Sequence, residues 1–509
     1  MLLSDSIEKI IYYKVKKMIR LLNKRVVFVG VFILVLTSPK AQNSLQTNQS
    51  DVLKFDLKQA IEVALSENPT VIVSGQEVEK RQYAKKDAIS QLLPQISGSA
   101  GYTRTLKKQV MYMGGGGDGG GFTSMLMEPL IGLTKPLYDE LGMQMPNLNP
   151  DGNSESSDGG MEVGLDNNWS GGFSLSLPIF APTLYKSIQL SAVDIELAVE
   201  QARASEQDLV NQVSKAYFQL LLAQDSYEVL KQSYKQAEDN FETVNNKYEQ
   251  GLVSEYDKIR AEVQVRNLNP SLIQARNAVT LTKLQLKVLI GIDSEKDVSI
   301  SGQLSDYETD LYADYMHMDT SLLANNSSLI QMDLQAKMLK KSYEINKTAF
   351  LPNVSLSAIY QWTAMNNDFK IKDYIWNPYS TVGVTISIPI FTGGSRSFKM
   401  KQTKIQMNQL EWNRVNLQRN LNMQAESYLN NMQQSVEQLA SNKENVNQAL
   451  KGRTIAQKRY DVGKGTILEL NDSELALTQS KLTYTQSIYD FLVAKTDLDL
   501  VLGKEAKIK

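Results

Sequence analysis

Apolar and small residues step by three and four positions along two long stretches of the chain, residues 184–248 and 395–460. This spacing is typical of coiled-coil helices. At 1.5 Å per residue either helix would span roughly 100 Å, which is too long for the interior of a compact domain. After each stretch the helical period resumes, over residues 255–290 and 467–502. The pattern therefore predicts two long antiparallel helical hairpins.

The turns of the two hairpins share one sequence pattern. KYEQGLVSEYDKIRAE (residues 247–262) aligns without a gap on RYDVGKGTILELNDSE (residues 459–474), at an offset of 212 positions. Glycines interrupt the helical pattern in both copies, as is usual where a helix ends. The alignment pairs residues around the turn: Tyr248 with Tyr460, Gly251 with Gly463, Ser254 with Thr466, and Asp257 with Glu469.

Shorter segments alternate apolar and polar residues with a period of two, which predicts β-strands. They start after Pro94 and Pro352 and return toward Pro178 and Pro389, so the sequence predicts four strands in two hairpins. One face is apolar with aromatic residues toward one end, and the other is rich in serine. Strands of a lipid-facing β-barrel require this pattern over about 10 residues. Half-buried strands of a soluble sandwich would look similar, and the long helices favour the barrel.

The whole order of elements occurs twice. LLPQISGSA (92–100) matches FLPNVSLSA (350–358) at an offset of 258, and LSLPIF matches ISIPIF at an offset of 211. The difference of 47 residues is an acidic, glycine-rich loop in the first copy. The predicted first repeat (55–292) has a helix (57–92), a β-hairpin (94–178) with a long loop (104–168), and a helical hairpin (183–290). A connector (293–318) follows. The predicted second repeat (319–504) has a helix (319–350), a β-hairpin (352–389) and a helical hairpin (394–502).

The N-terminal segment has the pattern of a secretory signal. Lysines and arginines precede an apolar run over residues 26–36, and small and polar residues follow. A membrane-spanning helix needs about 20 apolar residues, so this run is too short to be one. We expect a signal peptide over residues 1–41, with a possible upstream extension before Met18.

Composition excludes most enzyme chemistry. The 509 residues include no cysteine and a single histidine, so thiolate or multi-histidine metal sites and cysteine nucleophiles are excluded. The formal net charge of −2 gives no basic excess that would indicate nucleic acid. We therefore expect no catalytic site, no cofactor, no metal and no nucleic-acid partner.

Four strands cannot close a barrel in a membrane, because lipid does not satisfy the backbone groups of an open sheet edge. Two, three or four copies would supply 8, 12 or 16 strands, and their helices would come together as a second, helical tube. The sequence thus predicts an oligomer.

The duplicated order resembles the TolC-like outer-membrane efflux family. The strand entries LLPQIS and FLPNVS, the exits LPIF and IPIF, and the two Tyr-x-x-Gly-x-x-Ser/Thr-x-x-Asp/Glu turns carry the resemblance. It implies a mostly α-helical fold with membrane β-strands: a homotrimer whose 12-stranded β-barrel lies in outer-membrane lipid and continues as a periplasmic α-helical barrel. It also implies a periplasmic adaptor (membrane fusion) protein and an inner-membrane pump of the RND or ABC type.

The resemblance also implies roles for residues of the turns. Glu469 and Asp472 would line an acidic ring at the entrance, and Tyr460 with Asp257 would form a latch between the hairpins. A family arginine that reinforces this latch falls on Gly465, so that link is absent. The adaptor would dock on both turns: Gly251, Leu252, Val253 and Ser254, and Gly463, Lys464, Gly465 and Thr466.

The expected function is that of a passive trimeric channel in the outer membrane of a Gram-negative bacterium. It would export small molecules or secreted substrates from a tripartite efflux or secretion complex. The alternative is a periplasmic coiled-coil scaffold protein without a pore.

Overall fold

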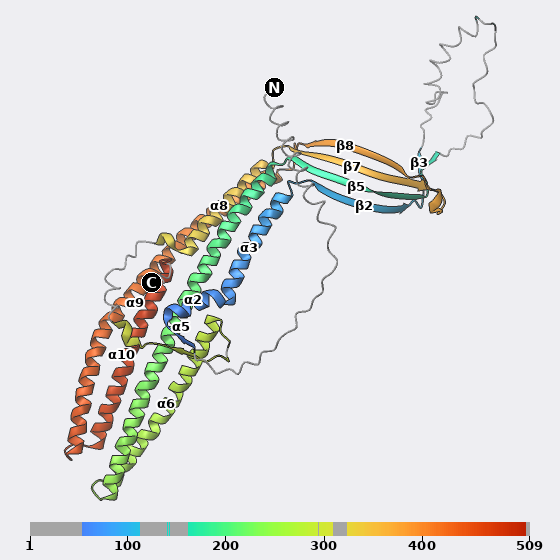
Figure 1. The fold of residues 1–509 in the computed structure, drawn as a ribbon. Helices are drawn as coiled ribbons and strands as arrows, with labels where there is room; N and C mark the ends of the chain where they lie inside the picture. Colours follow the sequence, from blue (N-terminus) through green and yellow to red (C-terminus); the bar gives the residue numbers. More distant parts are fainter. Residues whose placement is uncertain are drawn as a thin grey trace. The chain divides into compact units, whose positions relative to one another are not determined.

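The computed structural model describes most of both repeats (Figure 1). The expected signal peptide, most of the 104–168 loop and the end of the connector lie outside the described residues. Those described are 53–111, 140, 142, 161–293, 295–308 and 323–504.

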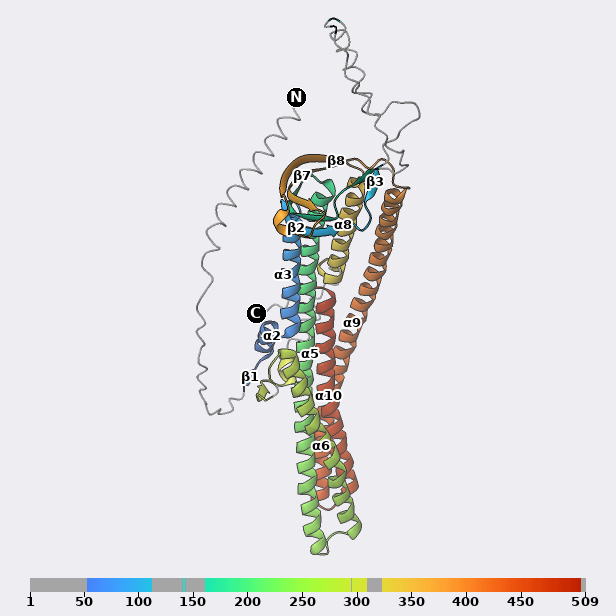
Figure 2. The same cartoon turned by 90° about the vertical axis from the view of Figure 1, so that its right-hand side faces the viewer.

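Four long helices form the two predicted hairpins, and Figure 2 shows the members of each pair side by side. The first pair is α5 (Pro182–Glu249) and α6 (Glu255–Ile290), and the second is α9 (Ser395–Asp461) and α10 (Ile467–Val501). The helices of each pair pack against each other, as antiparallel coiled-coil neighbours do. Helix α6 continues through Pro270, which lies inside it.

The prediction of one helix over residues 57–92 is wrong, because the chain forms α2 (Leu57–Glu67) and α3 (Pro69–Ser90) instead. The side chain of Asn68 accepts a hydrogen bond from the Thr70 amide at 2.8 Å and so caps α3. Pro69 has no amide hydrogen and occupies the first turn, where none is needed. In the second repeat Asn326 caps α8 (Ser327–Thr348) in the same way, after the short turn η2 (Leu323–Asn325).

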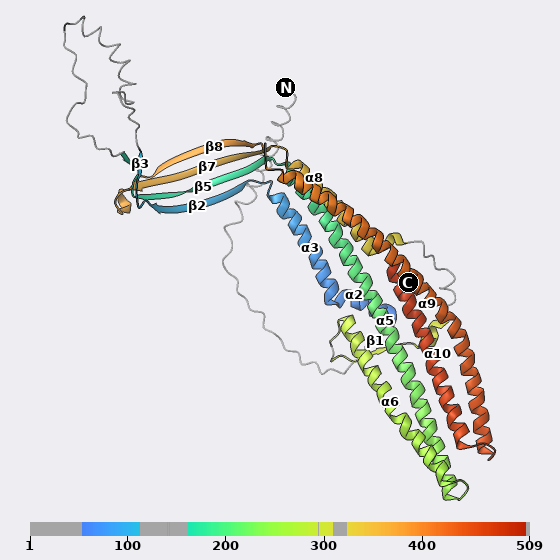
Figure 3. The ribbon, with the colours of Figure 1, turned by 180° about the vertical axis from the view of Figure 1, so that it is seen from behind.

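The four predicted strands form one antiparallel sheet in the order β2-β5-β7-β8 (Figure 3). Pro94 and Pro352 directly precede β2 and β7; Pro178 lies in β5 at a register shift, and Pro389 follows β8. The hairpins join where β5 pairs with β7. The bounds are β2 (Gln95–Arg104), β5 (Asn167–Phe180), β7 (Asn353–Asn366) and β8 (Asn377–Ser387).

The faces of this sheet differ in polarity. On β8 a row of exposed apolar residues occupies one face: Val382, Val384 and Ile386. Serines occupy the face that includes Ser97 and Ser174, whose hydroxyl oxygens are 2.7 Å apart across β2 and β5. Among the described strands, β2 and β8 each pair on one side only, so both are edges.

Three-residue strands form two further pairs, which the sequence pattern does not predict. β1 (Leu53–Phe55) runs parallel to β6 (Val298–Ile300), so the connector docks beside the helices through backbone hydrogen bonds. β3 (Gln109–Met111) pairs with β4 (Met161–Val163) at the base of the long loop. Two short turns complete the described structure, η1 (Leu304–Tyr307) and η3 (Ile371–Asp373).

The main core lies where the repeats meet. Tyr217 and Leu220 of α5, Leu286 of α6 and Phe491 of α10 are buried in it together. α5 packs against α3, α6, α8 and α10, and is thus the central helix. None of the described helices carries an apolar stretch long enough to cross a membrane.

Candidate functional site at the ends of the helical hairpins

The first turn joins α5 to α6 through a glycine in the left-handed conformation. Gly251 has a φ of 73°, which non-glycine residues rarely adopt. Its amide donates to the Tyr248 carbonyl at 2.8 Å, and the Leu252 amide donates to the Lys247 carbonyl at 2.8 Å. This arrangement satisfies the last carbonyls of α5. The side chain of Leu252 is 68% exposed, so the turn presents an apolar residue at its surface.

Ser254 starts α6 with a reciprocal cap. The Asp257 amide donates to the Ser254 Oγ at 3.2 Å, while the Asp257 carboxylate accepts from the Ser254 hydroxyl at 2.8 Å and from its amide at 3.3 Å. This capping box satisfies free amides at the helix start. The Asp257 carboxylate is thus bound within its own turn.

The second turn repeats the geometry of the first. Gly463 has a φ of 72°, and its amide donates to the Tyr460 carbonyl at 3.1 Å. The Lys464 and Gly465 amides both donate to the Arg459 carbonyl, at 2.8 and 3.0 Å. The Glu469 amide donates to the Thr466 hydroxyl at 3.2 Å, which caps α10.

Gly465 lies against the end of α9. A Cβ atom there would be 3.1 Å from both the Arg459 Cβ and the Tyr460 backbone nitrogen, closer than side chains normally pack. Glycine at this position therefore allows a close backbone approach. An arginine here would require the turn to move.

Apolar side chains from both hairpins meet just above the turns. We call this group the tip cluster: Val244, Ala261, Tyr460, Ile467 and Leu470, with Phe241, Val253 and Ala456 at its edge. Because the first hairpin supplies Val244 and the second supplies Leu470, the cluster holds the two hairpins together. Val253 is thus partly buried, unlike Leu252.

Tyr460 makes its contacts through its ring. The residue is 8% exposed, and its buried hydroxyl has no hydrogen-bond partner among the described residues. The ammonium of Lys247 lies 4.5 Å from the centre of the ring, within the range of a cation–π contact between α5 and α9. Burial first, and then the charge of Asp257, raises the pKa of Tyr460. The two latch residues are therefore near each other without sharing a hydrogen bond.

The two acidic residues of the predicted ring differ in their surroundings. Both Glu469 and Asp472 are exposed on the first turns of α10. Glu469 lies 3.5 Å from the Arg459 guanidinium across the second turn. Glu474 was not among the residues predicted from the sequence, and its carboxylate accepts a hydrogen bond from Arg453 at 2.6 Å in a largely buried ion pair. A spacing of 21 residues across a turn gave no signal of that pair.

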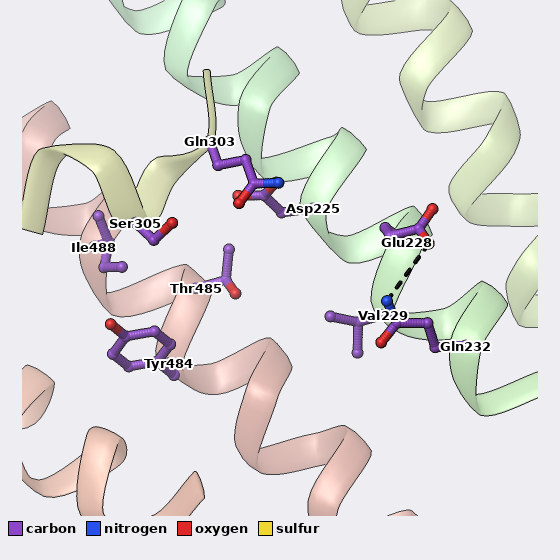
Figure 4. Close-up of a pocket in the computed structure, with 9 residues that line it drawn as sticks. All are labelled: Asp225, Glu228, Val229, Gln232, Gln303, Ser305, Tyr484, Thr485 and Ile488. Atoms are coloured by element: carbon purple, nitrogen blue, oxygen red, sulfur yellow. Dashed lines mark hydrogen bonds between the residues drawn. The ribbon is translucent and has the colours of Figure 1, made fainter. Parts of the chain in front are cut away.

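A cavity of about 230 Å³ lies farther up, between α5, α10 and η1 (Figure 4). The Asp225 carboxylate accepts a hydrogen bond from the Leu304 amide at 3.0 Å, and burial raises the pKa of that carboxyl. Tyr484 donates to Glu308 at 2.8 Å, and Lys443 pairs with the same carboxylate. These contacts fix the connector to the helices. Within the part of the chain that the structure describes, no group of three or more potential metal ligands occurs.

A sequence model of the family described as outer membrane efflux protein matches residues 143–292 and 320–504. The TolC outer membrane protein of Vibrio cholerae is 22% identical over 342 residues, which cover 66% of this chain and 76% of that protein. The alkaline protease secretion protein AprF of Pseudomonas aeruginosa is 23% identical over 337 residues, covering 65% and 68%.

The fold is similar to that of solved outer membrane channels. The crystal structure of the CmeC channel of Campylobacter jejuni superposes with a TM-score of 0.64 at 16% identity, covering 88% of this chain and 85% of that one. Long helical hairpins and a small antiparallel sheet are thus arranged alike despite low sequence identity.

Proposed function

Because the chain belongs to the outer membrane efflux protein family, we propose that three copies form a passive channel that completes a tripartite efflux or secretion complex. The protein lies in the outer membrane of a Gram-negative bacterium and extends into the periplasm. Substrates enter at the hairpin ends and leave through a closed β-barrel, and an inner-membrane pump supplies the energy.

The open four-stranded sheet carries the proposal. Its edges β2 and β8 lack a second partner within the described chain, and one face of β8 exposes a continuous apolar row. Unpaired edge groups cost several kcal/mol each in lipid, so the edges must pair with further copies. Three copies would close a barrel of 12 strands, with β8 of one copy pairing with β2 of the next.

The hairpin turns would dock the periplasmic adaptor. Each chain carries the same glycine turn twice, and each turn exposes one apolar residue next to its glycine: Leu252 directly follows Gly251, and Val462 directly precedes Gly463. Three chains would thus present six similar turns. An adaptor with repeated contact sites fits such an arrangement, because each copy meets the same backbone shape.

The entrance would be acidic and gated. In a trimer, three copies of Asp472 and Glu469 would lie around a narrow axis and favour cations over anions. Arg459 partly neutralises Glu469, so Asp472 would contribute more. The tip cluster, with the Tyr460 ring at its centre, would hold the hairpins in the closed arrangement, and a pump complex would separate them.

Bilayer recording on the purified protein tests the proposal. We expect a heat-resistant trimer on gels and stepwise ionic currents in planar bilayers. A protein that stays monomeric and conducts no current would instead be the periplasmic scaffold considered from the sequence.

A further inference from the structure

The cavity between α5, α10 and η1 is built from three separate segments of one chain. The first repeat supplies α5, the second supplies α10, and the connector supplies η1 and the residue before it. Figure 4 shows the side chains of α5 facing those of α10 across the cavity. A ligand that binds here therefore needs no second copy of the chain.

The cavity has an apolar floor and a polar rim. Ile488 is 1% exposed and Thr485 is 9% exposed, and Val229 is partly buried beside them. Gln303 and Ser305 are exposed at the rim. An engineered protein cavity of about 150 Å³ holds a benzene molecule. The volume of about 230 Å³ thus has room for one small ring with a polar group attached.

The Asp225 carboxylate in the cavity wall has unused bonding capacity. Its two oxygens offer about four lone-pair sites, and among the described residues only the Leu304 amide donates to them, at 3.0 Å. Burial raises the pKa of this carboxyl, and the charge of Asp306 acts in the same direction. No basic group of the described chain offsets these two effects. A cation bound in the cavity would stabilise the charged carboxylate.

The surrounding charges also favour a cation. No lysine, arginine or histidine occurs among the described residues that line the cavity. Of the nearby acidic groups, Glu228 lies 3.5 Å from Lys231, and Glu308 pairs with Lys443, so both are already partly neutralised. The carboxylate of Asp225 is therefore the group in the lining that is left to attract a positive ligand.

A bare metal ion suits this lining poorly. Calcium takes about six to eight oxygen ligands, whereas no group of three or more potential metal ligands occurs in the part of the chain that the structure describes. Val229 and Ile488 offer no ligand atoms, but they favour the burial of hydrocarbon. A ligand with an ammonium group and a small hydrocarbon group matches both halves of the cavity.

We propose that this cavity binds a small protonated amine, whose ammonium group donates to the Asp225 carboxylate and whose hydrocarbon group packs on Val229 and Ile488. Gln303 and Ser305 offer oxygen acceptors at the rim for the other ammonium hydrogens. Hydrogen bonds between charged groups are the stronger ones, so Asp225 orients the ligand. The site goes beyond the proposed channel function, because neither the turns nor the membrane sheet contribute to it.

Calorimetric titration of the purified full chain with benzylammonium chloride tests the proposal, and titration into detergent alone gives the blank. We expect one binding site per chain. Benzyl alcohol has nearly the same shape without the charge, and ammonium chloride has the charge without the ring. Each should bind about ten-fold more weakly or worse, because each lacks half of the contacts. Equal affinity for benzyl alcohol, or no binding of benzylammonium, would overturn the proposal.

Asp225→Asn locates the site, since it removes the charge and keeps an oxygen that can accept from the Leu304 amide. It should weaken benzylammonium binding about ten-fold or more. Asp239→Asn is the matched control, because Asp239 is exposed on α5 and does not line the cavity. Asp472→Asn tests binding at the hairpin ends instead. Both should keep the wild-type affinity, and loss of binding in Asp472→Asn alone would overturn the proposal.

A second pair of variants leaves Asp225 intact. Ser305→Lys places a competing ammonium at the exposed rim of the cavity, whereas Ser305→Gln adds a side chain of similar length without a charge. We expect Ser305→Lys to bind benzylammonium several-fold more weakly than Ser305→Gln does. This pair decides the question even if Asp225→Asn lowers the yield of folded protein. Equal affinities of the two Ser305 variants would exclude a cation site beside that residue.

Discussion

Tyr460 lies between the two hairpins, and the contacts that it makes are those of its ring. Its hydroxyl is buried and has no hydrogen-bond partner within the part of the chain that the structure describes, while the Lys247 ammonium faces the ring from α5. A cation–π contact of this kind contributes about 0.5 to 2 kcal/mol, depending on how far it is removed from water. At the residue scale, we therefore expect Lys247 to matter more to the closed arrangement than the Tyr460 hydroxyl.

Lys247→Met keeps the aliphatic stem and removes the charge, so it should raise the open probability of the channel about two- to thirty-fold. Single-channel recording measures this directly. Tyr460→Phe is the matched control, because it keeps the ring and removes a hydroxyl that makes no hydrogen bond to any described residue. It should leave the open probability unchanged.

If Tyr460→Phe and Asp257→Ala raised the open probability equally, the Tyr460 hydroxyl would stabilise the closed channel, contrary to this prediction. The Tyr460–Asp257 hydrogen bond would then form in the assembled channel, as the family resemblance implied.

The acidic residues at the start of α10 differ in their partners, so we expect them to contribute unequally to the cation preference of the channel. Asp472→Asn should reduce the preference for cations over anions more than Glu469→Gln does, because Arg459 already lies 3.5 Å from Glu469. Reversal potentials in a salt gradient measure the preference. Equal preference in the wild type and in both variants would exclude an acidic ring at these positions.

At the scale of elements, some features could be predicted and others could not. The glycine turns could be predicted, because Gly251 and Gly463 interrupt a strong helical period, and both adopt a positive φ in the structure. The break between α2 and α3 could have been found, since Asn68 followed by Pro69 is a helix-start signal. The β1–β6 pair could not be predicted, because a three-residue strand is too short to show a period-two alternation, and its partner strand is distant in sequence.

Gly251→Val should impair export while leaving the trimer assembled. A valine at a φ of 73° costs about 1 to 2 kcal/mol in backbone strain, and no atom lies within 4 Å of the new Cβ, so the change stays in the turn. Drug sensitivity of cells that carry the matching adaptor and pump measures export. Full export by this variant would mean that the turn shape is not needed for docking.

Gly503→Ala should destabilise the protein, because the new Cβ would collide with the Asn325 carbonyl and φ is 64°. Gly452→Ala is the control: that glycine lies inside α9 with no atom within 4 Å of a Cβ, so alanine should stabilise the helix by about 0.5 to 1 kcal/mol. Thermal unfolding compares the two. Similar stability of both variants would argue against a close contact between Gly503 and the Asn325 carbonyl.

At the scale of the whole molecule, the duplication was the strongest signal in the sequence. It predicted the order of strands and helices in both repeats, because each proline junction and glycine turn occurs twice in register. Side-chain pairing within the site could not be predicted. The Lys247–Tyr460 and Arg453–Glu474 contacts depend on how helices from separate segments rotate against one another, and the hydrophobic period alone does not fix that rotation.

We propose that several copies of this chain close one membrane channel, and the conductance of the purified, heat-resistant oligomer in a planar bilayer tests this proposal. Reversal potentials are recorded in the same experiment. We expect stepwise, cation-selective currents whose selectivity falls in Asp472→Asn. A stable oligomer that inserts into the bilayer and passes no current would contradict it.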